Sequence, residues 1–194
     1  MEKRLWPVLE AAGIIGLPDA FRGNARMYNI TRSTMELEKE QIIEYFRRSY
    51  TAADGLWFVK AEEKYGFDAA LELDRAVWRV LPKIQARMLK HMGRPGRSLE
   101  ALRECLEIKL TLEGFRFRIE GIENTSGFRL VVTECPWYNL LLKSGRENIA
   151  AAVGDAICDT EYPVWAAEFG EEISFEMKSQ ICQGARNCIL KFTL

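Results

Sequence analysis

Histidine is almost absent from this chain, whose 194 residues include His91 as the single example. Histidine is the commonest metal ligand among side chains and the most frequent general acid or base. The sequence therefore excludes a histidine-rich metal centre, and a histidine-activated nucleophile would have to use His91. Nothing in the sequence brings His91 to a cysteine, and its place beside Lys90 suits the end of a helix, where a cation complements the dipole.

The chain also lacks long apolar runs and an excess of either charge. No stretch reaches the ~18 apolar residues that a membrane-spanning helix needs, and the first residues lack the apolar core of a signal peptide. The formal net charge is -1, and basic residues are interleaved with acidic ones. We therefore expect a cytoplasmic protein with no nucleic-acid partner and no membrane partner.

Fingerprints of phosphate-binding loops, dinucleotide-binding turns and serine hydrolase elbows are absent as well. Hydrophobic residues make up 48% of the chain and charged residues 28%, as in ordinary globular domains. We expect one domain over residues 35–194, with a helical part over 35–109 and a second part over 110–194. Residues 1–34 are rich in proline and glycine and predict an irregular arm.

Three helices are expected in the helical part. Apolar residues recur every three or four positions over residues 38–65, and Gly66 is a suitable stop. The same periodicity returns over residues 68–90, where Pro82 predicts a kink or a break. Ser98 is a favoured N-cap residue and predicts the start of the third helix.

The second part is expected to alternate hairpins with a helix. Apolar and polar residues alternate over 115–120 and 128–133, which predicts an antiparallel hairpin with one buried face. A helix is expected over 146–168, broken near Pro163, followed by a second hairpin of residues 173–181 and 188–194. This order predicts an α+β fold in which helices cover one side of an antiparallel sheet.

Four of the five cysteines lie in the last third of the chain: Cys135, Cys158, Cys182 and Cys188. The last two flank the expected tip of the second hairpin, so their sulfur atoms can meet. Cys135 ends the first hairpin, and Cys158 lies on the helix between the hairpins. If both hairpins share one sheet, all four thiols could converge as a four-thiolate zinc site.

Other interpretations of the cysteines stay open. A three-thiolate site would leave a position open or take a carboxylate from Glu134, Asp155 or Asp159. A reactive Cys135 would need a base, and buried cysteines can also serve as small core residues. Cytoplasmic thiols stay reduced, so we expect no disulfides, and Cys105, near leucines in a helix, is expected in the core.

Aromatic and acidic residues provide further candidates. Aromatic side chains could line a pocket for an apolar or planar ligand, or pack as ordinary core. The candidates for such ligand binding are Trp57, Trp78, Trp137 and Tyr138. Asp54 and Asp74 are each embedded among aromatic residues, and paired acids could perform acid–base chemistry or hold a hard metal. A solvated helix face is the commoner explanation of acidic residues.

From about Phe115 onward the chain resembles the 4-vinyl reductase domain. The marks are Cys158 on a helix and the pattern Cys182-x5-Cys188 followed by Ile-Leu-Lys-Phe. The resemblance implies the fold that this domain shares with TRAPP transport subunits and haem-type nitric oxide sensors, with helices on an antiparallel sheet. In related bacterial sensors of aromatic compounds, a helix cysteine, a glutamate and two hairpin cysteines hold zinc near the ligand pocket. Here the glutamate position falls near Ser179, so either Cys135 fills the gap or the site is not zinc.

Over residues 36–194 the chain more closely resembles an uncharacterised family of small bacterial and archaeal proteins. The marks are Asp54-Gly-Leu-Trp-Phe, Glu62-Glu-Lys-Tyr-Gly, Leu73-Asp-Arg-Ala-Val-Trp and the Cys135-Pro element. That family is similar in layout to hydrolases of 2-amino-thiazoline-4-carboxylate, a cyclic amidine.

Three hypotheses follow. The first is a binding domain for a small hydrophobic or aromatic molecule, stabilised by zinc on the four cysteines. The second, implied by the family resemblance, is a hydrolase of a small cyclic amidine that uses an open metal position or an activated Cys135. The third is an interaction protein, because TRAPP-like folds dimerise through helical faces, which implies a homodimer.

Overall fold

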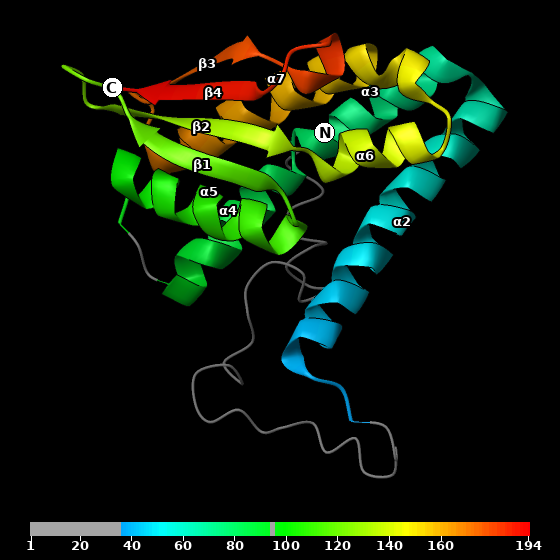
Figure 1. Cartoon of the computed structure of the whole chain (residues 1–194), viewed down its shortest axis with the longest axis horizontal. Coiled ribbons are helices and arrows are strands. Elements are labelled where there is room, and N and C mark those ends of the chain that lie inside the picture. The colour runs from blue at the N-terminus through cyan, green and yellow to red at the C-terminus, as the bar shows by residue number, and fades with distance from the viewer. Residues whose placement is uncertain (1–35, 94–95) are drawn as a thin grey trace. The chain divides into compact units, whose positions relative to one another are not determined.

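A computed structural model of the chain describes residues 36–93 and 96–194 (Figure 1). The chain divides into two compact units, Met1–Ile42 and Ile43–Leu194. The described part of the first unit contains only the start of helix α2 (Lys39–Tyr65), so the irregular arm predicted over 1–34 lies outside the described residues. The second unit has the predicted α+β architecture.

Helices α2 to α5 come first along the chain. They are α2, α3 (Phe67–Trp78), α4 (Leu81–Gly93) and α5 (Leu99–Glu113). Gly66 separates α2 from α3 with a φ of 86°, a conformation that glycine adopts readily. The predicted break falls before Pro82, which occupies the second position of α4, where its missing N–H is not needed for the helix.

Helix α5 has the start that its sequence predicts. The Ser98 hydroxyl accepts a hydrogen bond from the backbone N–H of Ala101 at 3.1 Å, which satisfies one of the free donors of the first turn. At the other end Gly114 adopts the left-handed conformation with a φ of 82°, and its backbone N–H donates to the carbonyl oxygens of Leu110 and Thr111. These two caps set the length of the helix that packs beneath the sheet.

A single antiparallel sheet joins the two predicted hairpins. Its strands are β1 (Arg116–Gly121), β2 (Gly127–Glu134), β3 (Ser174–Ser179) and β4 (Cys188–Thr193), in the order β1-β2-β4-β3. The hairpins meet through β2 and β4, where Phe128 faces Phe192 across the pair. The condition under which the four cysteines could converge is therefore met.

Two helices and two short 3-10 turns connect the strands: α6 (Pro136–Lys143), η2 (Glu147–Ile149), α7 (Ala150–Phe169) and η3 (Ile181–Gln183). Helix α6 is not among the helices expected from the sequence. Pro136 cannot donate to a sheet ladder and so ends the strand, but proline is also favoured at the first helical position. A break predicted at Pro163 is wrong, and α7 continues through it. Pro163 is exposed, while buried Tyr162 and Trp165 hold α7 against the core on either side.

The core lies between one face of the sheet and the helices α5 and α7 (Figure 1). The fully buried side chains include Leu102, Leu106, Leu130, Trp165, Leu190 and Phe192. Along the strands the inward residues alternate with charged residues on the other face, where Glu120 of β1 pairs with Arg118 of the same strand and with Arg129 of β2. This alternation is the reason that the period-two pattern predicted the strands well.

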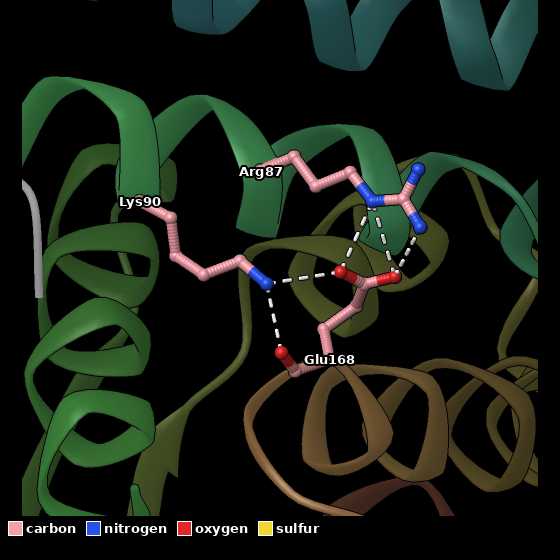
Figure 2. Close-up of polar contacts among 3 residues, drawn as sticks. All are labelled: Arg87, Lys90 and Glu168. Carbon is pink, nitrogen blue, oxygen red and sulfur yellow. Dashed lines mark hydrogen bonds and ion pairs between the residues drawn. The ribbon is translucent and has the colours of Figure 1, made fainter. Parts of the chain in front are cut away.

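A polar clamp joins α4 to α7 (Figure 2). Arg87 and Lys90 of α4 both bind the carboxylate of Glu168, with Nη2 of Arg87 at 2.8 Å and Nζ of Lys90 at 3.0 Å. Lys90 also donates to the backbone carbonyl of Glu168 at 2.7 Å. Burial alone would raise the pKa of Glu168, but the hydrogen bonds and positive charges of its partners outweigh burial and lower that pKa.

Helix α2 differs from the other long helices because none of its residues is buried. The apolar residues that recur at helical spacing over 38–65 include Phe46 and Trp57, yet their side chains are 65% and 78% exposed. Among the described residues, no helix combines the length and the apolar character that would let it cross a membrane.

Candidate functional site

Two adjoining chambers lie within the second unit. The outer chamber, of about 420 Å³, is bounded mainly by α2, α6 and the start of α7, with Thr51, Phe58, Leu140, Ser144, Arg146 and Ile149 in its wall. The inner chamber, of about 100 Å³, lies between α7, α6 and the sheet, with Phe115, Tyr138, Cys158, Tyr162, Met177 and Leu190 in its wall. Residues that line both chambers mark their junction: Asp54, Asp74, Trp137, Leu141 and Val153.

Three of the four predicted ligand-binding aromatics line these chambers. Trp78 and Tyr138 face the inner chamber, and Trp137 faces both. The rings of Trp78 and Trp137 meet edge to face, with centroids 5.8 Å apart and an interplanar angle of 88°. Trp57 lines neither chamber in the described structure and is 78% exposed, so it is not part of this cavity.

All four candidate metal-binding cysteines line the inner chamber. Cys135 precedes the first turn of α6, Cys158 lies on α7, Cys182 lies in η3 and Cys188 opens β4. A glycine on α7, Gly154, permits the close approach of η3, because a Cβ atom there would overlap the sulfur of Cys182. The inner chamber thus brings together four cysteines that are up to 53 positions apart in the sequence.

Without a metal these thiols are protonated at neutral pH. Burial is the main cause: it raises the pKa of Cys135 to about 12 and that of Cys182 to about 11, and it raises the pKa of Cys158 well above its usual value. The neighbouring thiols add to these increases. A nucleophilic thiolate at Cys135 is therefore not supported, and His91, which lines neither chamber, offers no base.

The donor chemistry of the cysteines suits a thiophilic metal. Backbone N–H groups of Trp137 and Tyr138 point to the sulfur of Cys135, and the N–H of Ile181 donates to the sulfur of Cys188 at 3.2 Å. Such N–H donors stabilise thiolate ligands in metal sites. Yet within residues 36–93 and 96–194 no group of three or more Cys, His, Asp or Glu side chains is arranged to hold an ion.

The carboxylates considered as a fourth ligand lie elsewhere. Glu134, Asp155 and Asp159 do not line the inner chamber in the described structure. Asp155 instead accepts a hydrogen bond from the side-chain amide of Gln183. Cys105 is 2% exposed within the hydrophobic core, which confirms its predicted packing role.

Asp54 of α2 and Asp74 of α3 form an acidic pair at the junction of the chambers. Burial, followed by repulsion from Glu113, raises the pKa of Asp54 to about 6. Burial and then repulsion from Asp54 raise the pKa of Asp74 to about 7, against a hydrogen bond from the Trp78 indole that lowers it. The pair thus brings two partly ionised carboxyl groups to an otherwise apolar cavity.

A buried charge network lies behind the inner chamber. Nζ of Lys109 binds Glu113 and Glu161 at 2.7 Å each, and Gln85 donates to Glu113 at 3.1 Å. Burial alone would lower the pKa of Lys109, but its two carboxylate partners raise it, whereas burial raises the pKa of Glu161. In this network one lysine faces two acidic side chains.

The sequence analysis missed this network although two signals were present. Lys109 follows Cys105 and Leu106 at helical spacing, which places a charge on a buried stripe. Glu161 likewise follows Cys158 and precedes Trp165 on the inner face of α7. A charge within an apolar stripe predicts a buried partner, and each of these two residues is the partner of the other.

The chain belongs to a family of unknown function (DUF6125), whose model matches residues 33–194. Neither the curated proteins nor the solved structures contain a significant match. The family assignment gives no activity.

Proposed function

We propose that this protein is a small-molecule binding domain that holds an apolar or aromatic ligand in the two chambers. The observation that carries the proposal is the cavity itself. Its outer chamber of about 420 Å³ falls within the ~300–1,000 Å³ that is typical of ligand pockets. Its walls are mainly aliphatic and aromatic, with a few polar groups at defined places.

The resemblance to the 4-vinyl reductase domain supports the same function. In sensors with that domain zinc lies near the ligand pocket, and here the inner chamber contains the four candidate cysteines and contacts the sheet through Val132, Met177 and Leu190. The predicted aromatics Trp78, Trp137 and Tyr138 stand in this wall. A flat apolar ligand would contact these rings.

We also propose that zinc binds Cys135, Cys158, Cys182 and Cys188. Zinc would tie the end of β2, the middle of α7, η3 and the start of β4 together at the closed end of the inner chamber. Protons must leave the four thiols on binding, so affinity would rise with pH. The convergence of the four cysteines on one chamber and the N–H donors around them support this part of the proposal.

The ligand proposal is tested with a solvatochromic apolar dye whose fluorescence rises in a dry pocket. Val153 lines both chambers, so Val153→Trp should fill the junction and remove most of the dye binding. Val77→Trp is the matched control, because Val77 is 51% exposed on α3. Equal dye binding by wild type and Val153→Trp would contradict the proposal.

The zinc proposal is tested by elemental analysis of protein purified without an affinity metal column. We expect about one zinc per chain and the release of four titratable thiols on chelation. Cys105→Ala is a control that should keep the metal, and Cys158→Ala should lose it. Absence of metal together with five free thiols would contradict the zinc proposal and leave the ligand proposal standing.

The acidic pair favours a second candidate, a hydrolase of a small cyclic amidine. A carboxyl group with a pKa near neutrality can give and take a proton during catalysis, and the pKa of Asp74 is about 7. Turnover of 2-amino-thiazoline-4-carboxylate by wild type, lost in Asp74→Asn and kept in Cys135→Ala, would favour this candidate. Binding without turnover favours the first.

We further propose a cytoplasmic location and a homodimer. A reducing compartment would keep the cysteine thiols available for metal. The exposed apolar side chains of α2, among them Phe46 and Trp57, are the surface that a second copy would cover. Light scattering at micromolar concentration should give about twice the 22.3 kDa chain mass, and a monomer would contradict the dimer.

A further inference from the structure

The acidic pair at the chamber junction differs from the other partly buried acids of the fold. Glu113 and Glu161 share Lys109, and Glu168 binds Arg87 and Lys90 (Figure 2). Glu62, beside the outer chamber, pairs with Arg146 at 2.5 Å. The folded chain thus provides a cation for these carboxylates.

Asp54 and Asp74 have no such cation among residues 36–93 and 96–194. In the part of the chain that the structure describes, the indole N–H of Trp78 donates a hydrogen bond to Asp74 and no ion pair reaches either carboxylate. Both carboxyl groups stand in the wall of both chambers, so an occupant of either chamber can reach them. A charged group within a cavity is normally paired with a group of opposite charge. For Asp54 and Asp74 the described residues do not supply the positive charge.

Neighbouring charges do not replace it. Arg146, the basic residue in the outer wall, is already bound to Glu62 and lies over the ring of Phe58 at 5.7 Å. Behind the inner chamber the Lys109 network carries more acid than base, and Glu113 repels Asp54. Among the described residues, these neighbouring groups therefore offer no cation that pairs with Asp54 or Asp74.

The aromatic residues at the junction suit the same kind of ligand. Trp137 lines both chambers, Trp78 the inner one and Phe58 the outer one. Aromatic faces attract organic cations as well as apolar groups. Two carboxylates beside such rings form a site for a positively charged head group with an apolar body, and a bare anion would be repelled.

We propose that the ligand of this cavity is an organic cation, a protonated amine or amidinium on an apolar body, whose charged group lies between Asp54 and Asp74. This inference rests on the proposed binding function and specifies its ligand class. The apolar body occupies the outer chamber, which is the larger of the two. The cationic group donates hydrogen bonds to both carboxylates and completes the charge balance that the protein leaves open.

The test compares three probes of nearly equal size at pH 8: benzylammonium, benzyl alcohol and benzoate, titrated into the full chain and followed by protein NMR. We expect benzylammonium to bind about tenfold or more tightly than benzyl alcohol, as for a charge-assisted hydrogen bond, and benzoate to bind most weakly. Asp54→Asn and Asp74→Asn should each reduce the preference for the cation and keep the binding of benzyl alcohol. Asp68→Asn, the same change at an exposed position of α3, should leave the preference unchanged.

Each other outcome has a separate meaning. Equal affinities for the cation and the alcohol in wild type, both lost in Val153→Trp, would overturn the cation inference and retain the binding function. Binding of none of the three probes would count against both. Saturable binding of Mg²⁺ alone that depends on both aspartates, without a preference for benzylammonium, would assign the pair to a metal ion and overturn the inference.

Discussion

Replacing Asp74 with asparagine is expected to stabilise the folded chain at neutral pH. The substitution keeps the size of the side chain and an oxygen that can accept the hydrogen bond from Trp78. It removes a negative charge that burial and the charge of Asp54 disfavour. A mutation at a cavity wall more often destabilises a protein, so the expected sign is a strict test of the electrostatic argument.

The magnitude follows from the pKa of Asp74. Its rise from 3.8 to about 7 spans about 3 units, or at most about 4 kcal/mol at 1.36 kcal/mol per unit. Asp74 remains partly accessible to water, and solvent screening reduces the effect. We therefore expect Asp74→Asn to raise the free energy of unfolding by roughly 1–2 kcal/mol at pH 8.

The pH dependence has a defined direction. Between pH 4 and pH 7 the folded chain holds a proton on Asp74 that the unfolded chain has released, so wild-type stability falls as pH rises through this window. Below the unfolded pKa both states are protonated, and the contribution of Asp74 vanishes. The stabilisation by Asp74→Asn should therefore be near zero at pH 4 and reach its full value above pH 7.

Urea denaturation of wild type, Asp74→Asn and the exposed control Asp68→Asn at pH 4.5, 6 and 8 measures this difference. The unfolding free energy of the control Asp68→Asn should not increase with pH relative to that of wild type. A destabilised Asp74→Asn at pH 8, or a gain of equal size at all three pH values, would refute the argument that the Asp74 charge is uncompensated.

Three further substitutions test other parts of the fold. Lys109→Met should destabilise the chain by about 3–5 kcal/mol in urea denaturation, because it leaves two buried carboxylates without their cation. The exposed control Lys60→Met should change the unfolding free energy by less than about 1 kcal/mol. Gly154→Ala alone should lower the unfolding free energy by roughly 1–3 kcal/mol, because the Cβ atom of the alanine would overlap the sulfur of Cys182. In a double-mutant cycle, Cys182→Ala should reduce that loss of stability. A loss of the same size in the Cys182→Ala background would contradict the contact. Ser98→Ala should lower the unfolding free energy by about 1 kcal/mol through loss of the α5 cap, and no change would show that the cap contributes nothing.

The strands were predictable because one face of the sheet is buried and the other is solvated. Leu130 and Leu190 point into the core while Arg129 and Lys191 point away, and this alternation is visible in the sequence. Caps were predictable for a similar reason, since Ser98 acts within its own helix. Such features depend on neighbours in the chain, which the sequence displays directly.

Features that depend on distant contacts were harder to predict. Phe46 and Trp57 have helical spacing, but spacing alone does not say whether a second element covers that face, and both are exposed on α2. Pro163 lies within a helix that tertiary packing holds together, so a local rule gave the wrong break. The shared chamber of the cysteines could be predicted only as a conditional statement, because it required the pairing of β2 with β4.

The acidic pair connects the stability of the fold to the proposed ligand. Asp54 and Asp74 disfavour the empty folded state, because each is partly buried and neither has a cation in the described structure. Selection for stability alone would disfavour an uncompensated charge at such positions. An uncompensated charge in a cavity wall is instead characteristic of a site whose partner arrives from solution.

The repulsion between Asp54 and Asp74 that Asp74→Asn removes is the same repulsion that a bound organic cation would neutralise. The stabilisation measured for Asp74→Asn and the affinity lost by the same variant for benzylammonium should therefore appear together. If the substitution stabilises the fold and leaves cation binding unchanged, the charge at Asp74 is a property of the fold and not of the binding site.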